Sequence, residues 1–165
     1  MRASRRAVVF GGAALAAMGA IGVAWAAPGE RPVPYWASIA ASQARMRTGP
    51  GRNFPVSWVY RRADLPVKVI EQYPAWRRVQ DVDGAQGWMM VNLLSDRRTA
   101  LVTAAEGLMR RKPDAAAPVA WRAQRGVVGR ISNCAGGWCL LDVRGRRGYI
   151  AVSQIWGVDP GEAVE

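Results

Sequence analysis

The sequence predicts an all-β protein made of two tandem small barrels, and three observations support that prediction. Glycine and proline are frequent, with 18 and 10 residues, as expected for short strands joined by tight turns. Apolar runs of strand length follow one another between those turns. The chain also repeats itself at an offset of 61 to 63 residues, so one small structural unit is built twice.

The repeat consists of matching residue types at matching intervals. The matched pairs are Met46 with Met109, Trp58 with Trp121, Trp76 with Trp138, and Trp88 with Tyr149. A unit of this size buries only about 60% of the surface that its unfolded chain exposes. We therefore expect the two units to pack on each other, or a crosslink to brace one of them.

The first unit is a series of short strands. Leu65, Val67 and Val69 alternate with Lys68 and Glu71, which is the pattern of a half-buried strand. Hairpin and 3₁₀ turns are expected at 83–84 and 92–94. The expected strands are 36–40, 44–48, 55–60, 65–73, 76–82, 87–91 and 99–103, the last of which closes the unit.

The second unit follows the same order with different turns. A Gly-Gly pair at 136–137 and an Arg-Gly-Arg segment at 144–146 are expected to be hairpin turns. The expected strands are 108–111, 127–133, 138–143 and 147–152.

The N-terminus has the layout of a secretory signal peptide at residues 1–26. Arg2, Arg5 and Arg6 precede an uncharged run over 7–23, and Ala24-Trp25-Ala26 is a small-x-small cleavage site. The paired arginines are also typical of a twin-arginine signal. The alternative is an uncleaved membrane anchor, and we expect membrane association only in that case. Cleavage lowers the formal charge from +11 to +8 and leaves a proline-rich tether at 27–35.

The absence of histidine excludes whole classes of chemistry. It removes histidine-based metal sites, Ser-His and Cys-His catalysis, and the commonest general base near neutral pH. The segment Asp81 to Gly84 hints at a calcium loop, but Ala85 and Gln86 occupy positions that such a loop reserves for a ligand and a glycine. We expect no enzyme activity, no metal and no cofactor.

Cys134 and Cys139 flank a tight hairpin loop. Their Cβ atoms are expected to face each other across two strands, within reach of a disulfide. Export favours oxidation. Free thiols, or a metal or redox pair, are the alternatives, although two thiolates fall short of four zinc ligands.

The first copy resembles a bacterial SH3 domain. The residues that carry the resemblance are Met46-Arg47-x-Gly49-Pro50-Gly51, Trp76-x-x-Val79, Asp83-Gly84-x-x-Gly87-Trp88-Met89 and Leu93-Leu94. The second copy lacks the Gly-Pro-Gly turn, but residues 155–162 and the Cys134 to Cys139 segment resemble exported tandem SH3-like proteins of Gram-negative bacteria. The resemblance covers about residues 32–162, and it implies two five-stranded SH3-like barrels in a periplasmic binding or scaffolding protein. We place the domains at 36–104 and 105–160, followed by a tail at 161–165.

Aromatic residues supply the candidate binding site. Trp58, Tyr60, Tyr73 and Trp76 lie near loop and strand ends, where an SH3-like groove for peptides or sugars is expected. The alternative is that these side chains pack inside the barrel, which is the usual use of tryptophan. Trp88 is interpreted as core.

The arginines come mostly in adjacent pairs. Neighbours on a strand point to opposite faces, so a pair does not by itself form one patch. Either these arginines form a solvated surface, or they attract anionic partners. Export argues against nucleic acid.

These observations predict a non-enzymatic periplasmic module that binds a peptide or a cell-wall component such as peptidoglycan. The alternative is a structural or adaptor protein that docks on another envelope protein. The first barrel keeps the turn signature and most of the groove aromatics, so binding is expected there, with the second barrel as a crosslinked brace.

Overall fold

A computed structural model describes residues 31–165, which form one compact unit of strands and short 3₁₀ turns. The predicted all-β class is confirmed. The predicted signal peptide at 1–26 and the first part of the tether lie outside the described residues. Within residues 31–165, no helix is long and apolar enough to cross a membrane.

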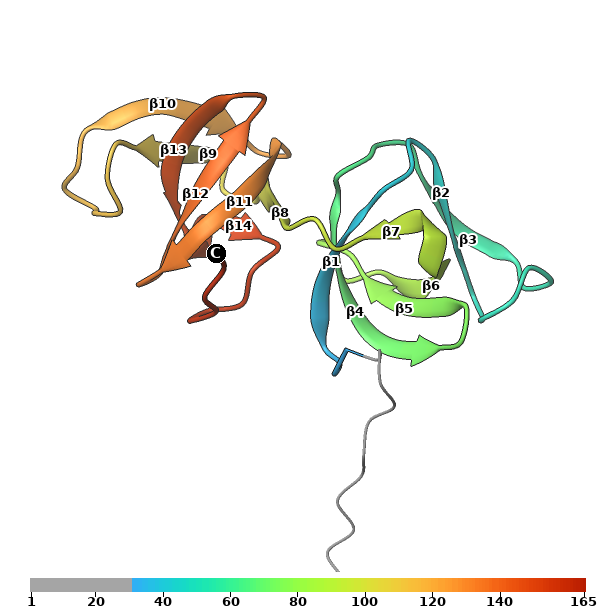
Figure 1. Ribbon diagram of the computed structural model, residues 1–165. Coiled ribbons are helices and arrows are strands. Elements are labelled where there is room, and N and C mark those ends of the chain that lie inside the picture. Colours follow the sequence, from blue (N-terminus) through green and yellow to red (C-terminus); the bar gives the residue numbers. More distant parts are fainter. Residues whose placement is uncertain (1–30) are drawn as a thin grey trace, which may run out of the picture. The chain divides into compact units, whose positions relative to one another are not determined.

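The first sheet is wholly antiparallel and curls around its own core (Figure 1). Its strands lie in the order β3-β2-β6-β5-β4-β1-β7. The elements are β1 (Tyr35–Ile39), β2 (Ala44–Arg47), β3 (Val56–Tyr60), β4 (Pro66–Tyr73), β5 (Trp76–Gln80), β6 (Gln86–Met90), η1 (Val91–Leu93) and β7 (Leu94–Ser95).

The second sheet has the order β10-β9-β13-β12-β11-β8-β14, which is the first order with seven added to each strand number. The predicted duplication is therefore confirmed in the topology as well as in the sequence. The elements are β8 (Thr99–Val102), β9 (Glu106–Arg110), β10 (Val119–Gln124), β11 (Val128–Ala135), β12 (Trp138–Val143), β13 (Arg146–Ala151), η2 (Val152–Gln154) and β14 (Ile155–Trp156).

Three details differ from the expectations. Each sheet has seven strands, two more than the resemblance implied. The strand expected to close the first unit at 99–103 is β8, which instead pairs with β11 and β14 of the second sheet. Trp88 is only half-buried, because Gly87 and Met89 on either side of it face the core and leave its ring on the outer face.

Alternation along each strand builds the two cores. In β2, Ala44 and Met46 are buried, whereas Arg45 and Arg47 face outward. Met46 joins Val67, Val69, Val79 and Met89 in the first core. The counterparts in the second core include Met109, Leu141 and Ile150.

A glycine backs the core methionine in both units. A Cβ atom placed on Gly87 would lie 2.6 Å from Cγ of Met46, and one on Gly148 would lie 2.7 Å from Cβ of Met109. No side chain fits at either glycine without a shift of its neighbours. The repeated Met and Gly positions therefore form one packing contact that is used twice.

The predicted disulfide between Cys134 and Cys139 is formed. It joins β11 to β12 across the Gly136-Gly137 turn, with the two Cα atoms 4.1 Å apart. Both cysteines are buried in the second core. Cys134 also pairs with Val164 through backbone hydrogen bonds, so the crosslinked hairpin holds the C-terminal segment.

The C-terminal segment makes polar and aromatic contacts with residues of the first sheet. The Trp36 indole N–H donates to Asp159 at 3.0 Å, and the Lys68 ammonium pairs with the same carboxylate at 2.6 Å. Trp156 meets the Trp36 ring edge-on, with centroids 4.8 Å apart. Trp36 is buried and therefore held in place, so its contacts with Trp156 and Asp159 hold the segment after β14 against the first sheet.

Candidate functional site

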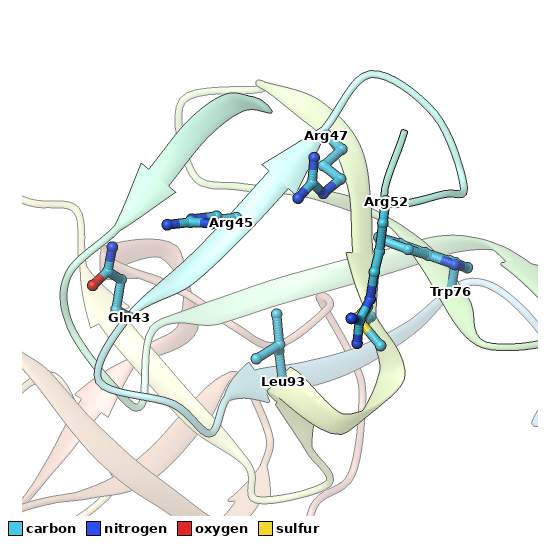
Figure 2. A pocket seen from close by; sticks show the side chains of 7 residues that line it. Gln43, Arg45, Arg47, Arg52, Trp76 and Leu93 are labelled. Carbon is cyan, nitrogen blue, oxygen red and sulfur yellow. The ribbon is translucent and has the colours of Figure 1, made fainter. Parts of the chain in front are cut away.

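A cavity of about 370 Å³ opens on the outer face of the first sheet (Figure 2). Figure 2 shows Arg45 and Arg47 side by side on one strand, and Arg52 coming from the loop that follows it. The cavity is lined by Gln43, Arg45, Arg47, Arg52, Trp76, Met90 and Leu93. Guanidinium groups therefore surround a base of one aromatic and two aliphatic side chains.

The sheet register explains why these side chains meet. Arg45 and Arg47 occupy the outward positions of β2, between the buried Ala44 and Met46. Trp76 is the Cα partner of Met90 in the pairing of β5 with β6. Trp76 is 8% exposed, so it forms the base of the cavity and does not stand out from the surface.

The three arginines differ in their partners. Arg47 donates a hydrogen bond to the carbonyl oxygen of Phe54 at 2.6 Å and so braces the loop between β2 and β3. The side chains of Arg45 and Arg52 make no hydrogen bond or ion pair with any residue in the range 31–165. Among the described residues 31–165, no Asp or Glu lines the cavity. Two exposed cations thus face one cavity without an internal counterion.

The second sheet keeps the arginine that hydrogen-bonds to its loop, but other positions that line the cavity in the first unit carry different residues. Arg110 donates to the carbonyl oxygen of Ala117 at 2.6 Å, across the same seven-residue separation as Arg47 and Phe54. Leu108 stands where the first unit has Arg45, and Gln154 stands where it has Leu93. The Gln154 side-chain oxygen accepts a hydrogen bond from the Leu108 backbone N–H at 3.3 Å. This polar contact has no counterpart at Leu93.

Comparison with protein families matches the chain twice. Residues 40–96 and 103–157 each match the family described as the bacterial SH3 domain. The chain belongs to the bacterial SH3 domain family. Bacterial SH3 domains are binding modules and commonly bind cell-wall components or peptides.

Solved structures similar to these tandem bacterial SH3 domains include two proteins from Trichomonas vaginalis and one from Bacillus cereus. NlpC1 from T. vaginalis is 13% identical with a TM-score of 0.35, over 82% of this chain and 50% of that one. NlpC2 from the same organism is 15% identical with a TM-score of 0.35, over 79% and 52%. An NlpC/P60 family protein from B. cereus is 12% identical with a TM-score of 0.34, over 74% and 56%. The chain spans about half the length of these proteins, and similarity at this level says nothing about activity. A comparison with curated proteins finds no match.

The four aromatic residues predicted for the groove lie in different places on the first bacterial SH3 domain. Trp76 forms the base of the arginine-lined cavity. Trp58 and Tyr60 line a separate cavity of about 200 Å³. Tyr73 is 55% exposed and meets Trp88 edge-on, with ring centroids 6.4 Å apart. The ligand-binding role of these residues stays a prediction.

Arg45 and Arg52 were not among the site residues predicted from the sequence. Most arginines form adjacent pairs in the sequence, whereas strand periodicity places residues two apart on one face. Arg45 and Arg47 flank the inward Met46, and that spacing is the signal that could have found them. Arg52 lies on a loop and carries no such signal.

Tyr60 and Asp81 form a buried polar pair beside the smaller cavity. The Tyr60 hydroxyl donates to the Asp81 carboxylate at 2.6 Å, and that carboxylate also accepts hydrogen bonds from the backbone N–H groups of Asp83 and Ala85. Burial, followed by the hydrogen bond to Asp81 and the nearby negative charges, raises the pKa of Tyr60 far above its usual value. The pair ties β3 to the turn between β5 and β6.

Because of this pair, the free energy of unfolding should fall as the pH rises through the alkaline range. Because the pKa of Tyr60 is higher in the folded state, the folded protein keeps a proton that the unfolded chain loses above about pH 10. The stabilisation is fully present below that pH and falls as the pH rises, by at most about 1.4 kcal/mol per pH unit. We expect Tyr60→Phe to remove this slope in urea unfolding measured across the alkaline range. The matched control is Tyr73→Phe, which removes an exposed phenol; a slope lost equally in both variants would contradict the assignment.

Proposed function

We propose that the protein is a non-enzymatic, periplasmic binding module whose first SH3 domain holds a peptide or a cell-wall component. The observation that carries the proposal is the open cavity over Trp76 on the outer face of the first sheet. Ligand sites typically combine apolar and aromatic walls with a few polar groups that orient the ligand. Trp76, Met90 and Leu93 supply the walls, and the rim is polar.

Location and lack of catalysis are parts of the same proposal. The disulfide between Cys134 and Cys139 supports an oxidising compartment, as does the signal-like layout of residues 1–26. A sequence without histidine supports binding over catalysis. Within residues 31–165 there is no group of three or more candidate metal ligands.

The test is retention of the folded protein on purified peptidoglycan sacculi. We expect saturable retention that falls by about tenfold or more in Trp76→Ala, because the variant loses an aromatic contact surface. Leu93→Gln, which introduces the residue of the second unit, should weaken retention in the same direction. Trp138→Ala, at the matching position of the second domain, is the control and should retain binding.

Thermal unfolding must first show that each variant stays folded. Equal retention of the Trp76 and Trp138 variants would place the binding surface elsewhere. No retention of the wild type would contradict wall binding.

A second candidate function, docking on another envelope protein, is favoured by the edge strand β3. Within the part of the chain that the structure describes, this strand is hydrogen-bonded only to β2, and Val56, Trp58 and Val59 on it are exposed. Trp58 is 57% exposed. An unpaired edge with apolar side chains is able to accept a further strand.

In the second unit, the tryptophan that matches Trp58 is Trp121, and it is held by contacts within its own sheet. There the Trp121 indole N–H donates to the carbonyl oxygen of Arg147 at 2.8 Å, and the Arg146 guanidinium lies 4.9 Å from the centre of the Trp121 ring. Crosslinking in intact envelopes distinguishes the two functions. A protein adduct that is lost in Trp58→Lys, together with no retention on sacculi, would support docking.

A further inference from the structure

The cavity on the first domain carries positive charge that residues 31–165 do not neutralise. The ion pairs within residues 31–165 engage other basic residues, and none involves Arg45 or Arg52. Arg47 is turned to the Phe54 carbonyl oxygen, which removes none of its charge. Three guanidinium groups therefore border one cavity, and no acidic side chain of residues 31–165 lies in its lining. An anion bound there would be stabilised by all three.

The second domain shows that the fold does not require this charge. At the constant offset of 63 residues, Arg45 corresponds to Leu108, and Arg52 corresponds to Ala115. Gln43 corresponds to Glu106, which pairs with Arg122 at 3.2 Å. Only Arg47 has a basic counterpart, Arg110, and both brace their loops in the same way. The two arginines without a structural contact are thus the two that the second copy lacks.

The chemistry of the lining indicates which anion fits. A guanidinium group donates two parallel N–H bonds to a carboxylate, in a fork that a lysine cannot reproduce. Beneath the guanidinium groups, Trp76, Met90 and Leu93 offer an apolar surface beside the charge. A monoanion with a small apolar side chain next to it matches both parts. A phosphate dianion would leave the apolar base unused.

We propose that Arg45 and Arg52 bind the terminal carboxylate of a peptide, while Trp76, Met90 and Leu93 contact the side chain of its last residue. This inference rests on the proposed function, in which the same cavity holds a peptide. It adds that recognition is of a free chain end and not of an internal segment.

The primary experiment is an NMR titration of the ¹⁵N-labelled protein with two probes. One probe is N-acetyl-trialanine with a free carboxylate, and the other is the same peptide as its C-terminal amide. We expect only the acid to shift the backbone signals of the segment from Gln43 to Arg52. Equal shifts from both probes, or none from the acid up to its solubility limit, would overturn the inference.

Variants distinguish binding of the carboxylate by the cavity arginines from nonspecific attraction by the protein's net positive charge. Arg45→Leu and Arg52→Ala introduce the residues of the second domain at exposed positions, so the fold should be kept, and each should weaken binding of the acid by about tenfold or more. Arg45→Lys keeps the charge and loses the fork, so it should bind more weakly than the wild type. Arg61→Ala removes one exposed charge outside the cavity and is the matched control. A loss of affinity in Arg61→Ala as large as that in Arg45→Leu would overturn the inference.

Sacculi distinguish the source of the carboxylate and separate this inference from the proposed function. Conversion of wall carboxylates to amides should abolish retention of the wild type if wall peptides supply the chain end. Retention that is unchanged by amidation would overturn the inference and leave wall binding intact. Binding of the acid peptide without retention on any sacculi would support a protein C-terminus as the source and contradict wall binding. Displacement of the acid peptide by an equal concentration of inorganic phosphate would identify a phosphate site in its place.

Discussion

Replacing Met109 by alanine should lower the free energy of unfolding by about 2–5 kcal/mol, the usual cost of truncating a large buried side chain. Met109 is fully buried in the second core, and its Cβ atom lies against the bare backbone of Gly148. Because Gly148 has no side chain to move inward, the cavity left by the truncation cannot close easily. Met46 packs on Gly87 in the first core, so Met46→Ala should have a similar cost.

Urea unfolding followed by tryptophan fluorescence measures both effects. Met90 supplies a control, because it is a half-buried methionine at the cavity and lies outside the core. Met90→Ala should change the free energy of unfolding by about 1 kcal/mol or less. If Met109→Ala cost no more than Met90→Ala, the packing assigned to the repeated Met and Gly positions would be wrong.

The residues that repeat are those that build the fold. Met46 and Met109 fill the two cores, and Arg47 and Arg110 donate to the carbonyl oxygen seven residues later in each loop. The repeat therefore predicted the all-β class and the tandem organisation, because it recorded the packing that each unit needs. The repeat includes Trp76 at the base of the cavity, but for the same reason it could not predict the charged part of the candidate site. The residues that distinguish the cavity, such as Arg45, are those at which the two copies differ.

The repeat offset also locates the first strand of the second unit. At 63 residues, Trp36 to Ile39 correspond to Thr99 to Val102, which is β8. This correspondence would have placed β8 at the start of the second unit, where it pairs with β11. The second copy of β3, β10, was also missed: both strands are mostly exposed and neither shows apolar alternation, but β3 is rich in aromatic and β-branched residues, whereas β10 ends in Arg122-Ala123-Gln124. Edge strands are poorly predicted in this way, since their periodicity depends on a buried face.

The arrangement of the four groove aromatics depended on contacts that local patterns do not encode. Trp58 and Tyr60 are two residues apart on β3 and share one cavity. Trp76 lies on β5 and faces a different cavity through its pairing with Met90. The assignment of a residue to one cavity or the other depends on sheet register, and register is set by long-range pairing.

Removal of the disulfide by the double substitution Cys134→Ala and Cys139→Ala should lower the free energy of unfolding by about 2 kcal/mol. The loop between the two cysteines is short, so the entropy that the crosslink removes from the unfolded chain is at the low end for disulfides. Both side chains are buried in the second core, so some packing is lost as well. The backbone pairing of Cys134 with Val164 should then open first, and hydrogen exchange at Val164 reports it.

A reductant provides the matched comparison, because it breaks the same bond without changing the side chains elsewhere. It should destabilise the wild type by a similar amount and leave the double variant unchanged. Wild-type stability that is insensitive to reductant under unfolding conditions would contradict a stabilising role for the crosslink. Arg45, Arg52 and Trp76 lie on the first domain and the crosslinked hairpin lies on the second, so the double variant should keep its affinity for the acid peptide. Stability lost without loss of binding would separate the two domains by role, with the second as the brace and the first as the binding unit.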